Sequence, residues 1–210
     1  MEKIWTEKKA EDFLRKRIPV ARSMIVKNAT SARKFSKKYP VVLKVISEKA
    51  LHKSDIGGVM IAHNAEELEK HFADLENMVK KRKLKAQILI QEFVSGRELV
   101  IGISKDPVFG HVIMFGLGGK YVETIKDVNF RVCPITEKDA EGMIEDMKYK
   151  KLLYGVRGEK PVNISAIKKT LVKVSCIPKS YKKLKEIDIN PLIADENGVK
   201  AVDARIIWES

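Results

Sequence analysis

Residues 51–59, LHKSDIGGV, form a polar segment with a histidine and two glycines that lies between two apolar runs. The run before it, residues 41–46 (VVLKVI), is short, continuous and rich in β-branched residues, which predicts a buried strand. The run after it, residues 57–62 (GGVMIA), predicts a second strand that begins at a glycine pair. Glycine adopts backbone angles that other residues avoid and lets a ligand approach the backbone. This arrangement favours phosphate chemistry over simple packing.

Lys44 places a positive charge inside the first of these strands, where a core strand ordinarily carries none. A buried charge is costly unless an opposite charge or hydrogen bonds accompany it. We therefore expect an anionic partner for Lys44. His52 supplies an ionisable imidazole on the following segment, which the glycine pair and the polar composition predict to be able to move.

The composition limits the classes of protein to which the chain can belong. With 210 residues, 44% of them hydrophobic, the chain can bury a core in one domain or in two tightly joined lobes. No stretch approaches the roughly 20 apolar residues of a membrane helix, and the first residues have no apolar targeting core. We therefore expect a cytoplasmic protein. Cys133 and Cys176 lack CxxC spacing, so we expect two reduced, buried thiols and no structural zinc.

The net charge of +13 raises the question of nucleic acid, because a basic surface attracts any polyanion. Much of the excess charge lies in residues 80–83, 148–151 and 179–185, which carry no interleaved aromatic pattern typical of a nucleic-acid site. The favoured interpretation is a solvated basic surface that helps to gather anionic substrates.

Apolar periodicity and turn residues predict an α+β chain with two lobes and a cleft. The expected helices are residues 6–17, 30–38, 65–82 with Asn64 as the cap, 136–148 and 165–174. The expected strands are residues 21–26, 41–46, 57–62, 88–94, 98–103, 111–117, 184–193 and 199–207. Ser95-Gly96-Arg97 resembles a hairpin turn between two of them. We expect residues 18–85 to form the small lobe and residues 1–17 and 86–210 the large lobe.

Several polar residues stand inside or beside these apolar strands. Asp188 and Asn190 lie on one face of a strand by its two-residue period, and Asp203 is a lone carboxylate in the next strand. An amide oxygen and a carboxylate on neighbouring strands suit Mg²⁺, a hard cation that keeps several waters and bridges phosphates. A structural reading also stays open, in which Asn190 caps a turn and Asp203 pairs with Arg205. Glycine-rich residues 116–119, which follow a strand, are weak evidence by themselves.

Several motifs occur in one order along the whole chain: VVLKV, HKSDIGGV, IQEFV, GREL, IMFGLGGKYVE, FRVCPIT, GVRG, DINPL and AVDARI. Together they resemble the ATP-grasp β subunits of ADP-forming acetyl-CoA synthetases. These belong to the NDP-forming acyl-CoA synthetases, a superfamily that includes succinyl-CoA synthetase. The resemblance implies a two-lobed ATP-grasp fold with a nucleotide cleft, and an acid–thiol ligase that uses ATP/ADP and Mg²⁺.

The resemblance also implies roles for individual residues. By motif position Lys44 contacts nucleotide phosphates, and Gly57 and Gly58 belong to the loop over them. Glu92, Phe93 and Val94 lie at the hinge that contacts adenine, and Glu98 resembles the acid that binds ribose. Asn190 and Asp203 resemble the metal-binding pair. Asp188 matches the acetyl-CoA synthetase form of the family, where succinyl-CoA synthetases carry a glutamate. His52 matches the histidine proposed to carry phosphate.

The implied reaction is acyl-CoA + ADP + phosphate ⇌ acid + ATP + CoA, with His52 passing a phosphoryl group to Mg-ADP. Nothing in the sequence resembles the coenzyme A domain with its own phosphohistidine, so a separate α subunit is the expected partner. Two other functions stay open. One is a free-standing ATP-grasp carboxylate ligase, against which the histidine loop argues. The other is a non-catalytic basic module that binds nucleotide or nucleic acid.

Overall fold

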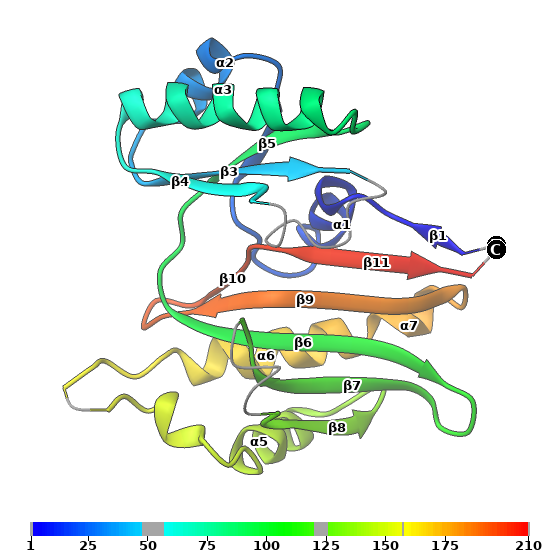
Figure 1. The fold of residues 1–210 in the computed structure, drawn as a ribbon. Coiled ribbons are helices and arrows are strands. Elements are labelled where there is room, and N and C mark those ends of the chain that lie inside the picture. The colour runs from blue at the N-terminus through cyan, green and yellow to red at the C-terminus, as the bar shows by residue number, and fades with distance from the viewer. Residues whose placement is uncertain (1, 48–56, 120–125, 157, 210) are drawn as a thin grey trace. The chain divides into compact units, whose positions relative to one another are not determined.

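The computed structural model describes residues 2–47, 57–119, 126–156 and 158–209 (Figure 1). The chain divides into two compact units. The small unit comprises residues 6–9 and 21–93, and the large unit comprises residues 1–5, 10–20 and 94–210. Helix α1 (Glu7–Leu14) begins in the small unit and continues in the large one.

The small unit is a four-stranded antiparallel sheet with two helices on one face (Figure 1). In sheet order the strands are β2 (Ser23–Val26), β5 (Gln87–Glu92), β3 (Val41–Ile46) and β4 (Val59–Ala62). The helices are α2 (Ala29–Phe35) and α3 (Ala65–Lys81). Asn64 caps α3 as expected, because its side chain accepts a hydrogen bond of 2.8 Å from the Glu67 N–H.

Strand β3 is buried along its whole length, although its two faces have different neighbours. Val41, Leu43 and Val45 belong to the core formed with α2 and α3. Because side chains alternate across a strand, Lys44 lies on the face away from the helices. The strand that the sequence predicted is therefore present, and the structure places its lysine on the face opposite the apolar core.

The large unit is built on one antiparallel sheet, in which the described residues form seven strands. Its main path runs β1 (Lys3–Ile4), β11 (Ala204–Trp208), β9 (Leu184–Ala194), β6 (Arg97–Asp106), β7 (Gly110–Leu117) and β8 (Val128–Val132). Strand β10 (Val199–Ala201) also pairs with β9. The further helical segments are α5 (Glu137–Glu145), a 3₁₀ turn at Lys150–Leu152, α6 (Ile164–Ser175) and α7 (Ile177–Ser180).

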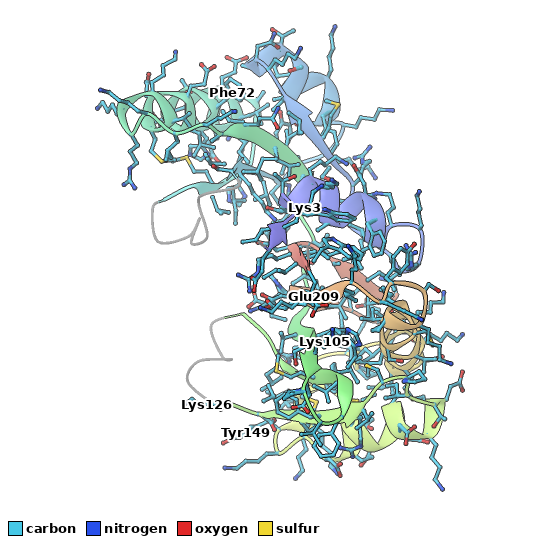
Figure 2. The ribbon with its side chains drawn as sticks, turned by 90° about the vertical axis from the view of Figure 1, so that its right-hand side faces the viewer. Lys3, Phe72, Lys105, Lys126, Tyr149 and Glu209 are labelled. Carbon is cyan, nitrogen blue, oxygen red and sulfur yellow. The ribbon has the colours of Figure 1, made fainter. Side chains whose placement is uncertain are left out.

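The main core of the large unit lies between this sheet and helices α5 and α6 (Figure 1). It includes Phe115 on β7, Met143 on α5 and Leu171 on α6, all of them fully buried. At one end of the sheet the Lys105 ammonium on β6 donates to both carboxylate oxygens of Glu209 at 2.8 Å (Figure 2). That pair is about 40% exposed, so its contribution to stability is small.

Three details differ from the sequence-based expectations. Residues 95–97 do not join a hairpin, because β5 pairs with β2 and β3 whereas β6 pairs with β7 and β9. Strand β5 therefore belongs to the small unit, which ends at Phe93 and not at residue 85. The expected strand 199–207 is interrupted at residues 202 and 203, and its two parts pair with different stretches of β9.

The cysteines are free thiols as expected, but both are only half-buried. Burial raises the pKa of the Cys133 thiol to about 12, and the nearby Cys176 adds to the shift. None of the helices in the described residues is long and apolar enough to cross a membrane.

We expect Cys133 to resist alkylation in the folded protein. At pH 8 an unfolded cysteine with a pKa of about 8.5 is partly thiolate, so iodoacetamide should modify folded Cys133 on the order of 1,000-fold more slowly than the urea-unfolded chain. Because the folded-state pKa is the higher one, this thiol favours folding below pH 8.5 and progressively less as the pH rises toward 12. Peptide mass spectrometry measures both rates. Equal rates in buffer and in urea would contradict the shift.

Candidate functional site

Lys44 has an anionic partner within the small unit, the carboxylate of Glu7 in the first turn of α1. The Lys44 Nζ donates to Glu7 Oε1 at 2.9 Å. The side chains are only 8% and 2% exposed, respectively. A buried charge needs such a partner, so the expectation of an anion is met by a carboxylate that lies 37 residues away in the sequence. Sequence reasoning missed Glu7 because an acid in the first turn of a helix is ordinarily exposed.

The glycine pair lies beside Lys44. Lys44 is directly opposite Val59 in the β3–β4 ladder, and the Val45 N–H donates to the Gly58 carbonyl at 2.8 Å. Gly57 has φ = +71°, a conformation that favours glycine. On the same face as Lys44, Val59 and Ile61 are about 40% exposed. The structure thus places a buried ammonium, the glycine backbone and an exposed apolar surface on one face of the small sheet.

The predicted hinge residues follow directly from β5. Glu92 Oε1 accepts a hydrogen bond of 3.0 Å from the Arg22 N–H, and the Glu92 N–H donates to the Arg22 carbonyl at 2.9 Å. These bonds fix the end of β5 against the start of β2. Phe93 comes next with 41% of its surface exposed and ends the small unit, and Val94 begins the large unit. An exposed aromatic ring after a fixed strand end can stack against the face of a planar ring such as a base.

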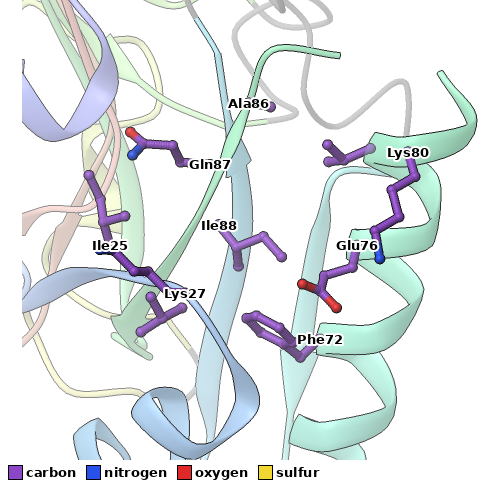
Figure 3. Close-up of a pocket in the computed structure, with 10 residues that line it drawn as sticks. Ile25, Lys27, Phe72, Glu76, Lys80, Ala86, Gln87 and Ile88 are labelled. Carbon is purple, nitrogen blue, oxygen red and sulfur yellow. The ribbon is translucent and has the colours of Figure 1, made fainter. Parts of the chain in front are cut away.

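A cavity of about 280 Å³ lies elsewhere in the small unit, between the sheet and α3 (Figure 3). Ile88 of β5 and Phe72 of α3 line it, with Glu76 and Lys80 from the same helix. Ile88 faces the helices, whereas Lys44 lies on the opposite face of the sheet. The cavity is therefore separate from the residues that the sequence singled out.

In the large unit, the predicted residues Glu98 and Asn190 both contact the glycines that follow β7. The Gly119 N–H donates to Asn190 Oδ1 at 2.9 Å. The Gly118 N–H donates to the carbonyl of Glu98 at 2.8 Å, and the Glu98 carboxylate rests against the open face of Gly119. The glycine-rich segment that was weak evidence in the sequence thus brings Glu98 and Asn190 together, although they are far apart along the chain.

Asn190 and Asp203 lie at matched interruptions of neighbouring strands. Residues 190 and 191 form a bulge in β9, since Leu99 pairs with Leu192 and Ile101 with Ile189. On the other side of β9, residues 202 and 203 separate β10 from β11 and lie opposite this bulge. The Val202 N–H donates to the Pro191 carbonyl at 3.2 Å. Bulges redirect side chains and are frequent beside functional sites.

Charged neighbours surround Asp188, which is opposite Arg205 in the β9–β11 ladder. Burial raises the pKa of the Asp188 carboxyl above its usual range, while Arg205 opposes the shift and the carboxylates of Glu186 and Asp203 add to it. Asp203 is thus close enough to Asp188 for their charges to interact. Arg205 also forms an ion pair with Glu186.

The donor atoms at this site fit a hard divalent cation. Asn190 offers an amide oxygen whose orientation is fixed by Gly119, and Asp203 offers a carboxylate in the matched interruption. Among the described residues no three His, Cys, Asp or Glu side chains form a group that could hold a metal. A cation here would take two protein ligands and complete its shell with water and phosphate, as Mg²⁺ does.

The structure gives no contacts for the remaining predicted site residue, His52. His52 lies outside the described residues, together with its neighbours Lys53 and Asp55.

The small unit thus holds a buried lysine beside a glycine pair, and the large unit holds an asparagine and an aspartate at a strand bulge. The chain belongs to the ATP-grasp family, since the model of the ATP-grasp domain matches residues 2–207. This finding confirms the predicted two-lobed ATP-grasp class of fold.

The chain is 45% identical over 197 residues to the β subunit of acetate–CoA ligase [ADP-forming] I of Pyrococcus furiosus, covering 90% of this chain and 85% of that subunit. It is 43% identical to acetate–CoA ligase [ADP-forming] I of Archaeoglobus fulgidus over 90% of this chain. The match spans only 29% of that longer protein. These relatives confirm the resemblance that the motifs indicated.

Two solved structures of acetyl-coenzyme A synthetase 1 from Candidatus Korarchaeum cryptofilum are also similar. One, in complex with coenzyme A and Ca-AMPCP, has a TM-score of 0.93 at 43% identity and covers 99% of this chain and 94% of that one. The other contains coenzyme A and Mg-AMPPCP, with its phosphohistidine segment pointing towards the nucleotide-binding site. It has a TM-score of 0.84 at 41% identity and covers 97% of this chain and 92% of that one.

Proposed function

We propose that the chain is the nucleotide-binding β subunit of an ADP-forming acyl-CoA synthetase. The observation that carries this proposal is the 45% identity over 85% of a β subunit of an ADP-forming acetate–CoA ligase. The proposed overall reaction is acyl-CoA + ADP + phosphate ⇌ acid + ATP + CoA. The part assigned to this chain is phosphoryl transfer between a histidine and ADP.

In this proposal the residues of the small unit bind the nucleotide. Lys44 contacts the phosphates, and Glu7 holds the ammonium in place through the 2.9 Å ion pair. The backbone of Gly57 and Gly58 lies next to the phosphates, as the pairing of Gly58 with β3 beside Lys44 suggests. The backbone at residues 92–94 contacts the base, and the exposed ring of Phe93 supports an apolar contact there.

The residues of the large unit bind the ribose and the metal ion. Glu98 accepts from the ribose hydroxyls, and Asn190 and Asp203 hold Mg²⁺ through oxygen atoms. When bound, Mg²⁺ neutralises phosphate charge. The protein supplies positioning and electrostatic stabilisation, which dominate catalysis of phosphoryl transfer.

His52 is the proposed carrier of the phosphoryl group. An oxygen of the β-phosphate of ADP attacks phosphorus as the phosphorus–nitrogen bond of phosphohistidine breaks, which yields ATP and leaves the electron pair on the imidazole nitrogen. Neutral imidazole is a good nucleophile near pH 7, so the reverse transfer from ATP is equally accessible.

The phosphoryl group comes from a partner in this proposal. The chain spans 29% of the single-chain relative from A. fulgidus and 85% of the separate β subunit from P. furiosus. We assign coenzyme A binding and the formation of the acyl phosphate to a separate α subunit that carries a second phosphohistidine. The net charge of +13 on this chain would attract the anionic substrates of the enzyme.

A labelling experiment tests this function. The purified chain is mixed with Mg²⁺ and γ-labelled ATP, and the protein is examined for bound phosphate that is stable in base and labile in acid. We expect such a label, and its removal on addition of ADP. Binding of Mg-ATP without any label, alone and with a candidate α subunit, would favour a free-standing carboxylate ligase. Salt-sensitive DNA binding without ATP affinity would favour a non-catalytic module.

A further inference from the structure

We infer that Gly119 is a positioning residue that sets the Asn190 amide and the Glu98 carboxylate for the metal–nucleotide complex. This inference rests on the proposed function and assigns that site a residue that does not itself touch the ligand. It follows from three contacts within the large unit, all of them made by residues 98, 118, 119 and 190.

The first contact fixes the orientation of the Asn190 side chain. An asparagine amide has one acceptor oxygen and one donor nitrogen, and only the oxygen can bind a cation. The Gly119 N–H donates to Oδ1 at 2.9 Å, which identifies that atom as the oxygen and holds it in place. The carbonyl oxygen has two lone pairs, so the second remains available for a cation. Partners that orient a ligand in this way strongly affect metal affinity.

The second group of contacts places Glu98. Its carbonyl accepts from the Gly118 N–H at 2.8 Å, so the backbone of Glu98 is tied to the residue before Gly119. Its carboxylate occupies the space where a side chain at position 119 would begin, and a Cβ there would overlap Glu98 Oε2. The absence of a side chain at position 119 therefore allows the Glu98 carboxylate to lie where it does.

The backbone conformation at position 119 also favours glycine. Gly119 has φ = +61°, in the left-handed region where other residues are strained. This conformation directs its N–H toward β9, where Asn190 lies in the bulge. One residue thus links the amide that would hold the cation to the carboxylate that would bind the ribose.

The test uses the full chain and compares Gly119→Ala with Gly110→Ala as a matched control. Gly110 also has positive φ, +78°, but a Cβ there would meet no atom within 4 Å. Affinity for Mn²⁺ in the presence of ADP is measured by electron paramagnetic resonance. We expect Gly119→Ala to weaken Mn²⁺ binding by about 10- to 100-fold, as for other residues that orient a metal ligand, and Gly110→Ala to leave it unchanged.

A double variant separates positioning from a general structural effect. With ADP saturating, so that an effect of Glu98 on nucleotide binding does not enter, Gly119→Ala/Asn190→Ala should bind Mn²⁺ no more weakly than Asn190→Ala alone if Gly119 acts on the metal through Asn190. Fully additive losses would overturn the inference while leaving the proposed function intact. If the unmodified chain bound no Mn²⁺ with ADP, the proposed function would fail and this inference with it.

Hydrogen exchange tests the hydrogen bond from the Gly119 N–H to Asn190 in the absence of nucleotide and metal. The variants are made at position 190, so the result does not depend on whether Gly119→Ala folds. The Gly119 amide should be protected in the unmodified chain and in Asn190→Asp, which keeps an acceptor oxygen. In Asn190→Leu it should exchange at least about tenfold faster, because the partner of the N–H is lost. Equal protection in Asn190→Asp and Asn190→Leu would overturn the inference.

Discussion

Replacing His52 by alanine is expected to abolish phosphoryl transfer while leaving nucleotide binding nearly intact. Loss of a covalent nucleophile removes the acceptor itself, so we expect ATP formation with the α subunit to fall by at least roughly 10⁴-fold. Affinity for Mg-ADP should change by less than about threefold, since the residues assigned to binding are elsewhere. Steady-state turnover and calorimetric titration with Mg-ADP measure the two quantities.

His63→Ala is the matched control for this prediction. His63 is exposed and immediately precedes the cap of α3, within the same unit of the fold. It should retain turnover and the acid-labile label. Unchanged turnover in His52→Ala would rule out His52 as the phosphate carrier. Equal loss in both variants would point to a general effect of removing a histidine from this unit.

Replacing Glu7 by glutamine is expected to destabilise the small unit strongly. The change removes the carboxylate that pairs with Lys44 at 2.9 Å and leaves a buried ammonium without that charge. Removing one partner of a buried ion pair typically costs several kcal/mol, and we expect the free energy of unfolding to fall by roughly 3 kcal/mol. Urea unfolding followed by circular dichroism measures the loss.

Glu69→Gln is the control for this substitution. Glu69 pairs with Arg33 at the same distance of 2.9 Å, but the two side chains are 51% and 58% exposed. Its replacement should cost less than about 1 kcal/mol, because solvent screens an exposed pair. If the two glutamine variants lost equal stability, burial would not be the source of the effect at Glu7.

A double replacement separates the structural role of Lys44 from its role in binding. In Glu7→Leu/Lys44→Met both charges are gone, so most of the stability lost in Glu7→Gln should return. Affinity for Mg-ADP should remain low, because the cation expected to contact phosphate is absent. Full nucleotide affinity in this stable variant would argue against a phosphate contact by Lys44.

The failures of local sequence signals are as informative as the successes. Ser95-Gly96-Arg97 has the composition of a hairpin turn, yet it links strands of two different sheets. Turn residues report the local conformation of the backbone, and they do not specify with which strand each neighbour pairs. The interruption at residues 202 and 203 was not predicted either. Both flanking stretches are apolar, so their pattern is that of one continuous strand.

The sequence by itself determined the class of fold and the identity of most candidate residues. Apolar runs and caps located β3 and α3, and the order of motifs from VVLKV to AVDARI indicated the family and drew attention to His52, Lys44 and Asn190. These signals are local, and each can be recognised within a few consecutive residues.

Only the tertiary structure decided which of these residues meet. The Lys44–Glu7 pair joins positions 37 residues apart, and the bond from Gly119 to Asn190 joins positions 71 residues apart. Such contacts depend on strand order, on register and on the bulge in β9, which arise when distant segments pair and pack. Periodicity tells which face of a strand is buried, whereas the partner of a buried polar group is set by the folding of the whole chain.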